Sequence, residues 1–302
     1  MAGFGVFRAV LAAIVLGLGA VAAQGEERIE LQSGGLTLGA RLVLAEGGSL
    51  ADGVVLLTHG TMGHYGMETI SAQQQTLAER GINTLAITLS LGIDRRTGFF
   101  DCATPARHRH QDALAEIGLW LEWLKGQGAG KIALMGHSRG GNQTAWFAAE
   151  NPQAGFGKVI LLAPILSDPY AEAASYERRF GVPLAEPLEQ ARALVKAGRG
   201  DEMMRVPGFL FCRDAQVSAA AFASYYEPEP RRNTATLLPR IAQPVLVIGG
   251  TADNVVPNLE QAIGPMADGE KIVLRMIEDS DHAFLDFFAE DAADAVAEFL
   301  SW

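Results

Sequence analysis

The stretch Gly136-His137-Ser138-Arg139-Gly140 stands between an apolar run, residues 131–135, and a helix-like segment, residues 142–150. The run has the length of one buried strand, and Asn151-Pro152 closes the helix. The serine therefore lies on a tight strand-to-helix turn, which holds its hydroxyl clear of the sheet. Free N–H groups at the start of the helix would stabilise negative charge on a reacting oxygen. The pattern predicts a nucleophile at Ser138; the alternative is a glycine-rich turn with an incidental serine.

The composition is that of a folded, acidic protein. The chain has 302 residues, enough for one large domain or for a core domain with an insertion. Hydrophobic residues make up 49% and charged residues 20%, which argues against a disordered chain. The formal net charge of -11 argues against nucleic acid or an anionic membrane surface as a partner.

The first 23 residues have the pattern of a secretory signal peptide. Arg8 precedes an apolar stretch, and small residues follow as far as Ala23, where cleavage is expected. An uncleaved membrane anchor is the alternative, but the apolar run is shorter than the ~20 residues that span a bilayer. We therefore expect a periplasmic or secreted protein with no stable membrane span after the signal is removed.

Buried-strand patterns alternate with helical patterns along much of the chain, which predicts an α/β fold. Helices are expected at residues 68–80, from Thr104-Pro105 onward, and directly after Ser138. An antiparallel pair of strands is expected near the start, and the remaining strands are expected at residues 54–58, 82–89, 131–135, 159–163, 244–248 and 271–277. This rhythm predicts a mostly parallel central sheet with helices on both faces.

The alternation of strand and helix patterns stops between residues 167 and 233. This part has helical pieces at 170–179, 186–197 and 218–225, several prolines and no clear strand. We expect it to be a helical cap inserted into the core, which then consists of residues 24–166 and residues 234–302.

Two further residues complete a catalytic pattern with Ser138. Asp253 follows the strand at 244–248, and His282 follows the strand at 271–277. Because the carboxyl ends of parallel strands meet at one edge of a sheet, the three side chains should converge there. A serine needs a histidine to remove its proton and an acid to orient that histidine.

The chain resembles the α/β-hydrolase superfamily over nearly all of its length after residue 23. The resemblance rests on the serine turn and on His59-Gly60, Gly250-Thr251-Ala252-Asp253 with Val256-Pro257, and Asp281-His282. It implies Ser138 as nucleophile, His282 as general base and acid, and Asp253 as the orienting carboxylate. It also implies an oxyanion hole formed by the backbone N–H groups of Arg139 and Thr61, with Met62 as a weaker alternative to Thr61.

Other polar residues near these motifs are expected to have ordinary roles. His137 should pack, and Asp281 should point away from its neighbour His282, so that Asp253 is the better partner. His108 and His110 are read as a solvated or salt-bridged helix end, because two residues apart on a helix they diverge by ~200°. The sequence therefore indicates no metal and no cofactor.

We expect an exported serine hydrolase that acts on a small-molecule carboxylic ester or related acyl compound. Amide or peptide hydrolysis and acyl transfer are the alternatives, because they share the acyl-enzyme chemistry. The oligomeric state is left open.

Cys102 and Cys212 are the only cysteines. They would form a disulfide between core and cap in an oxidising compartment, or remain as buried thiols. The sequence leaves both possibilities open.

Overall fold

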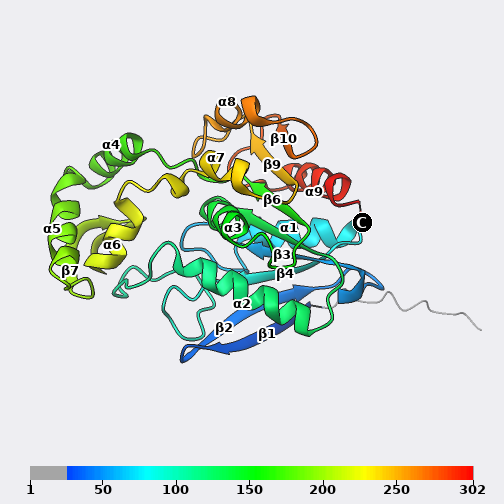
Figure 1. The fold of residues 1–302 in the computed structure, drawn as a ribbon, viewed down its shortest axis with the longest axis horizontal. Coiled ribbons are helices and arrows are strands. Elements are labelled where there is room, and N and C mark those ends of the chain that lie inside the picture. The colour runs from blue at the N-terminus through cyan, green and yellow to red at the C-terminus, as the bar shows by residue number, and fades with distance from the viewer. Residues whose placement is uncertain (1–25, 302) are drawn as a thin grey trace, which may run out of the picture.

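The computed structural model describes residues 26–301, so the predicted signal peptide, residues 1–23, lies outside the described residues. Within that range eight strands form one sheet in the order β1-β2-β4-β3-β5-β6-β9-β10 (Figure 1). Only β2 runs antiparallel to both of its neighbours. From β4 to β10 every pairing is parallel, which confirms the predicted fold class. The strands are β1 (Glu26–Ser33), β2 (Leu36–Val43), β3 (Val54–Thr58), β4 (Asn83–Thr88), β5 (Ile132–His137), β6 (Lys158–Leu162), β9 (Val245–Gly250) and β10 (Ile272–Ile277).

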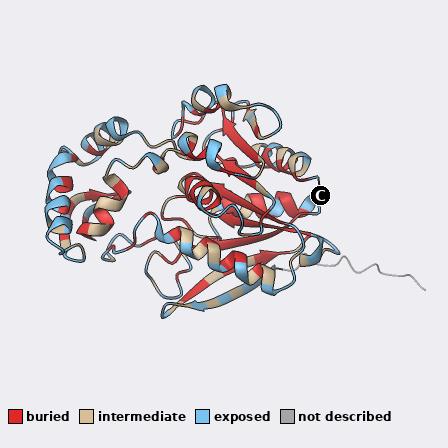
Figure 2. Ribbon diagram, viewed as in Figure 1, coloured by how far each residue is buried: buried red, intermediate tan, exposed pale blue. Residues whose placement is uncertain are grey.

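Helices cover both faces of the sheet because successive strand residues point to opposite sides. In β3, Val54 and Leu56 pack on the face under α2 and α3, whereas Val55 and Leu57 pack against α1 and α9. All five residues of β3 are buried, as the red central strands of Figure 2 show. The main core helices are α1 (Glu68–Glu79), α2 (Asp112–Gly126), α3 (Arg139–Glu150) and α9 (Phe287–Leu300), and the shorter α7 (Thr234–Leu237) and α8 (Leu259–Ile263) flank β9 in sequence.

The inserted segment forms a separate lobe beside the sheet (Figure 1). Its three helices, α4 (Pro169–Phe180), α5 (Ala185–Lys196) and α6 (Ala219–Tyr226), match the expected helical pieces. The expectation of no strand is wrong, because β7 (Met203–Phe209) and β8 (Cys212–Ser218) form an antiparallel hairpin. Pro207 and Gly208 argue against a strand in the sequence. In the hairpin the register passes over Pro207, whose nitrogen has no hydrogen to donate.

The helix expected from Thr104-Pro105 begins later, at Asp112. Ahead of it the chain pairs with the cap instead. The N–H of Ala106 donates to Gln216 O at 2.8 Å, and the N–H of Ser218 donates to Ala106 O at 2.9 Å. These bonds to β8 satisfy backbone groups that a helix would have used, so a tertiary contact overrides the local capping signal.

Cys102 and Cys212 form a disulfide with their Cα atoms 5.2 Å apart. Cys102 lies in the loop between β4 and α2, and Cys212 begins β8. The bond therefore ties the cap to a loop of the core across a sequence separation of 110 residues.

We expect the denatured, unreduced protein to contain no free thiol, as measured by thiol counting. In the chain-entropy model a cross-link of this span stabilises the folded state by about 4–5 kcal/mol, so the variant with Cys102→Ala and Cys212→Ala should unfold at lower denaturant. The wild-type protein under reducing conditions is the matched control and should show the same loss. Two free thiols in the wild-type protein would contradict the bridge.

Candidate active site

Ser138 occupies the turn between β5 and α3 with a φ of 55° and a ψ of −121°. This backbone conformation is strained for a residue with a side chain, and such strain is common at nucleophiles. Gly136 and Gly140 permit it. A Cβ at Gly136 would collide with the carbonyl oxygen of Gly140, and one at Gly140 would collide with that of His59. The predicted turn is therefore present, with glycines where the backbone segments meet.

Ser138, His282 and Asp253 lie in one hydrogen-bonded chain. The distance from His282 Nδ1 to Asp253 Oδ2 is 2.8 Å, and the distance from His282 Nε2 to Ser138 Oγ is also 2.8 Å. Because the Asp253 carboxylate can only accept, Nδ1 carries the proton and Nε2 is free to accept from the serine hydroxyl. The sheet thus brings together the three side chains that the sequence singled out.

The loop after β9 holds the Asp253 carboxylate in place. The N–H groups of Val255 and Val256 donate to Oδ1 at 2.7 and 3.0 Å. Burial raises the pKa of Asp253, but the hydrogen bonds from His282 and from these amides outweigh it, so its pKa lies below the ordinary value. The exposed Asp281 instead accepts from the N–H of Ala283 at 2.8 Å, a bond within its own turn.

Thr61 and Arg139, the two expected oxyanion-hole residues, lie beside Ser138. Both line the same cavity as Ser138 and His282, and Arg139 Nε donates to Thr61 Oγ1 at 3.0 Å. The N–H of Arg139 belongs to the first turn of α3, where no intrahelical acceptor exists. Met62, the weaker alternative to Thr61, is buried and has a φ of 57°.

Sequence reasoning missed Arg96, which holds the loop that carries Thr61. The residue is only 6% exposed, and its guanidinium donates to Leu89 O at 2.7 Å and to Gly63 O at 2.6 Å. It also lies 3.2 Å from His59 Nε2, which accepts from the N–H of Leu89. No local pattern marks this arginine, because its partners are carbonyl groups of loops that meet only in the folded chain.

His108 and His110 are buried, so the expectation of a solvated or salt-bridged helix end is wrong. His108 Nδ1 lies 2.9 Å from the hydroxyl of Tyr225, and His110 Nε2 lies 3.0 Å from Asn142 Oδ1. The segment precedes α2 and passes beneath the cap, which is why its side chains are covered. Among residues 26–301, no three histidine, cysteine, aspartate or glutamate side chains are grouped as a metal site would require.

Four histidines are buried in uncharged form. Burial lowers the pKa of His59 and of His108 to about 3 and that of His137 to about 4, and it holds the pKa of His110 well below the ordinary value. His137 packs against His282, and its Nε2 donates to the carbonyl oxygen of His282 at 2.9 Å. These rings bind protons in the unfolded chain below pH ~6.5 but stay neutral in the folded one.

We therefore expect the free energy of unfolding to decrease as the pH falls from 7 to 5. The unfolded state takes up the protons, so stability that is present above the unfolded pKa is lost on acidification. A single such histidine accounts for about 2 kcal/mol over this interval, at about 1.4 kcal/mol per pH unit below 6.5. Urea unfolding at pH 7, 6 and 5 measures the change. Glu116, whose pKa is raised by burial, acts in the opposite direction, but it is one group against four. Unchanged stability across this range would contradict the prediction.

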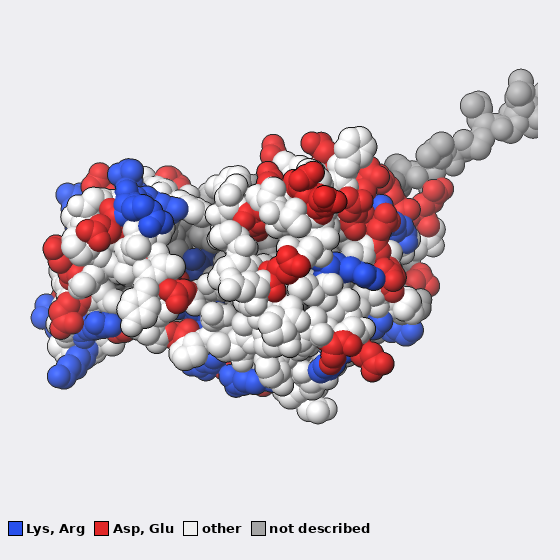
Figure 3. All heavy atoms as spheres, turned by 90° about the horizontal axis from the view of Figure 1, so that it is seen from above, with Lys and Arg blue, Asp and Glu red and all other residues white. Residues whose placement is uncertain are grey.

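The triad opens into a cavity of about 480 Å³ between the core and the cap. Figure 3 shows this side of the molecule hollowed between the two lobes. The cap supplies most of the aromatic wall, and the lining includes Phe99, Phe180, Phe211, Tyr176, Tyr225 and Tyr226. A mainly apolar organic group could therefore lie against Ser138.

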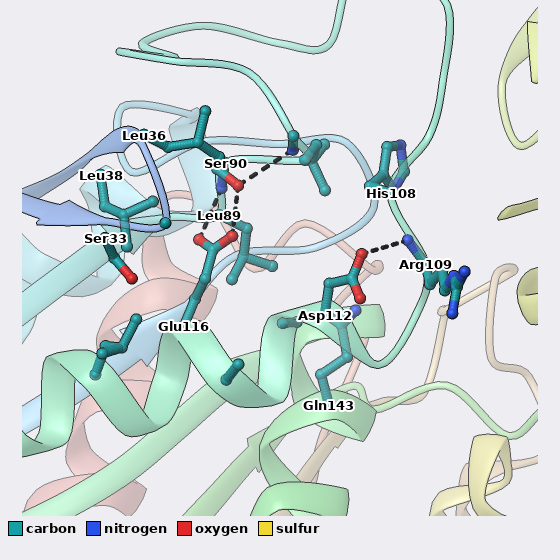
Figure 4. A pocket seen from close by; sticks show the side chains of 16 residues that line it. Ser33, Leu36, Leu38, Leu89, Ser90, His108, Arg109, Asp112, Glu116 and Gln143 are labelled. Carbon is teal, nitrogen blue, oxygen red and sulfur yellow. Dashed lines mark hydrogen bonds between the residues drawn. The ribbon is translucent and has the colours of Figure 1, made fainter. Parts of the chain in front are cut away.

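A second cavity of about 280 Å³ lies away from the triad (Figure 4). It is bounded by the turn between β1 and β2, the loop after β4 and the start of α2. Two carboxylates line it, those of Asp112 and Glu116, and Glu116 accepts from the N–H of Ser90 at 2.8 Å and from the Ser90 hydroxyl at 2.5 Å. None of Ser138, Asp253 and His282 lines it, so it is separate from the candidate active site.

Solved structures with a similar fold include esterases. Est1E from Butyrivibrio proteoclasticus, known also with ferulic acid bound, matches with a TM-score of 0.61 and 19% identity over 91% of this chain and 97% of its own. The Pyrococcus furiosus esterase Pf2001 matches with a TM-score of 0.58 and 15% identity over 92% of this chain and 91% of its own. The thioesterase domain from the curacin biosynthetic pathway matches with a TM-score of 0.54 and 19% identity over 92% of this chain and 100% of its own. At these identities the likeness concerns the fold.

The family assignment comes from the sequence comparison. A search of curated protein sequences finds no significant relative. As a separate feature of the fold, no helix within residues 26–301 is both long enough and apolar enough to cross a membrane. The model of the alpha/beta hydrolase family matches residues 54–299, which is most of the chain. With the parallel sheet and the strand-to-helix turn at Ser138, this match places the chain in the alpha/beta hydrolase family.

Proposed function

We propose that this protein is a serine hydrolase that cleaves carboxylic esters through an acyl-enzyme. The observation that carries the proposal is the hydrogen-bonded chain of Ser138, His282 and Asp253 at the wall of an apolar cavity. The esterases among the proteins of similar fold favour the ester over other acyl substrates.

In the proposed reaction Ser138 Oγ attacks the ester carbonyl carbon while His282 Nε2 takes the hydroxyl proton. Asp253 holds the imidazole in the required orientation and stabilises its charged form. The oxygen of the tetrahedral intermediate accepts from the N–H groups of Arg139 and Thr61, and one such donor is typically worth about 100-fold or more in rate. The carbon–oxygen bond to the alcohol then breaks, and the departing oxygen receives the proton from His282. A water molecule that His282 deprotonates then attacks the acyl carbon; the bond from that carbon to Ser138 Oγ breaks, Oγ takes the proton back from His282, and the acid leaves.

Export of the protein is part of the proposal. It rests on the signal-like pattern of residues 1–23 and is supported by the Cys102–Cys212 disulfide, since such bonds persist in oxidising compartments. Fractionation of expressing cells, with N-terminal sequencing of the mature protein, tests it. An N-terminus following Ala23 is expected, and an intact N-terminus in the cytoplasmic fraction would overturn this part.

Substrate profiling tests the reaction class. The purified mature protein is offered 4-nitrophenyl esters of graded acyl length, together with a matched thioester, anilide and lactone. Hydrolysis of the esters with the highest kcat/KM is expected. A higher kcat/KM on the anilide would replace the proposal by amide hydrolysis, and a product that appears only with an added alcohol acceptor would replace it by acyl transfer.

A further inference from the structure

Two arginines without a carboxylate partner among the described residues line the cavity beside Ser138, although the protein as a whole is strongly acidic. The chain carries a formal net charge of -11. Leaving aside the imidazole of His282, the acidic and basic side chains that line this cavity are Arg139, Arg179 and Glu172. In the hollow of Figure 3, basic atoms are visible between the two lobes. The lining therefore holds two cationic side chains against one carboxylate, in a protein whose net charge is negative.

The one carboxylate in this set is already paired. Glu172 lies 3.1 and 3.2 Å from the buried guanidinium of Arg232, and it accepts from the hydroxyl of Ser167 at 2.6 Å. Arg232 is only 1% exposed, so its charge needs this partner. Glu172 consequently does not neutralise the other two arginines.

Arg139 is half-buried, and the contacts of its guanidinium are all with uncharged groups. It donates to the hydroxyl of Thr61 at 3.0 Å and lies over the ring of Tyr225, 5.3 Å from its centroid. Its third contact is His110 Nδ1 at 3.3 Å. Among residues 26–301 no carboxylate lies within ion-pair distance of it.

The side-chain amide of Asn142, which is buried, fixes the contact between Arg139 and His110. Asn142 Nδ2 donates to Arg231 O at 3.0 Å, so Asn142 Oδ1 must be the atom that accepts from His110 Nε2. The proton of His110 is thus on Nε2, and its Nδ1 can accept from Arg139. Burial, together with the charge of Arg139, holds the pKa of His110 well below the ordinary value. The cation is therefore held in one place by neutral acceptors.

Arg179 adds a second cation at the exposed rim of the cavity. It donates to Leu210 O at 2.9 Å and lies 5.4 Å from the ring centroid of Phe211. Within the described residues it too has no carboxylate partner. Positioned guanidinium groups next to apolar surface recognise carboxylates through charge-assisted hydrogen bonds.

We propose that the cavity binds esters that carry a carboxylate on an apolar body, with Arg139 and Arg179 as the groups that recognise the anion. This inference deepens the proposed function and rests on it, since it assigns the substrate class of the same site. Arg139 would act twice, through its backbone N–H toward the oxyanion and through its guanidinium toward the substrate anion.

Matched ester pairs test the proposal. In the first pair the charge is on the acyl side: mono-4-nitrophenyl adipate against 4-nitrophenyl methyl adipate. In the second pair it is on the alcohol side: 4-carboxyphenyl hexanoate against 4-(methoxycarbonyl)phenyl hexanoate. We expect kcat/KM to favour the anionic member of at least one pair by about tenfold or more. Arg139→Gln and Arg179→Gln should each lower that preference, mainly through KM, and added salt should lower it too.

Arg213→Gln is the control variant. Arg213 also lies over a cap aromatic ring, 5.9 Å from the centroid of Phe180, but it does not line the cavity. It should leave the preference unchanged. A merely structural role of Arg139 would lower kcat/KM for both members of a pair equally. That result would overturn the proposal. So would a wild-type ratio of kcat/KM, anionic ester over neutral ester, of one or less in both pairs.

Binding to the Ser138→Ala protein separates this inference from the proposed function. Monomethyl adipate and dimethyl adipate are titrated by calorimetry, which needs no turnover. Tighter binding of the monoester without hydrolysis of any ester would overturn the proposed function and support the anion site. Hydrolysis of neutral esters with equal binding of the two probes would overturn the anion site alone.

Discussion

Ser138→Ala should lower kcat for ester hydrolysis by about 10⁶-fold and abolish labelling by a serine-directed phosphonate. The reason is that the variant retains the cavity and the imidazole but has no oxygen at the position 2.8 Å from His282 Nε2. Thermal unfolding should be close to that of the wild-type protein, because within residues 26–301 the hydroxyl forms a hydrogen bond with His282 alone. Kinetic assay and mass spectrometry of the labelled protein measure the two effects.

Ser175→Ala is the matched control for this variant. Ser175 lines the same cavity but makes no hydrogen bond with His282 or Asp253. It should retain turnover and labelling. If Ser138→Ala were still labelled, or if Ser175→Ala lost the label, the nucleophile would have been assigned to the wrong serine.

Asp253→Asn should lower kcat by about 10⁴-fold, the order seen when a triad carboxylate becomes an amide. Asp253 Oδ2 accepts from His282 Nδ1 at 2.8 Å and thereby keeps the lone pair on Nε2. An amide nitrogen at this position would donate to Nδ1, which moves the imidazole proton to Nε2 and prevents it from accepting the serine proton. Single-turnover and steady-state kinetics measure the loss.

Asp281→Asn provides the comparison, because Asp281 is adjacent to His282 in sequence but bonds to the N–H of Ala283. As a change to an exposed side chain it should leave activity near the wild-type level. A larger loss in Asp281→Asn than in Asp253→Asn would show that the acid has been assigned wrongly.

The sequence by itself determined the features that depend on local order. Alternating strand and helix patterns were enough to predict the parallel sheet, because buried strands in such a sheet must be apolar on both faces. Ser138, Asp253 and His282 could be chosen because each lies in the turn or loop after a predicted strand, within the motifs through which the chain resembles the α/β-hydrolase superfamily. In a parallel sheet that position alone determines at which edge a side chain lies.

Only the tertiary structure decided the features that depend on contacts between distant segments. Residues 103–111 carry a helix-start signal, yet Ala106 pairs with β8, and the cap buries His108 and His110. The cap hairpin contains Pro207, although proline is an unfavourable residue within a strand. Local sequence therefore argued against this hairpin.

The surroundings of Ser138 show the same division. The backbone turn at Ser138 is specified by neighbouring residues in the sequence. The charge of the cavity instead depends on which acidic side chains form ion pairs with Arg139 and Arg179 in the folded protein. Glu172 could have neutralised them but is held by Arg232, 60 residues away in sequence. Cys102 and Cys212 likewise meet across 110 residues. Local patterns specify elements and their ends; which side chains then become partners depends on how a cap packs on a core, since those distances exist only in the folded chain.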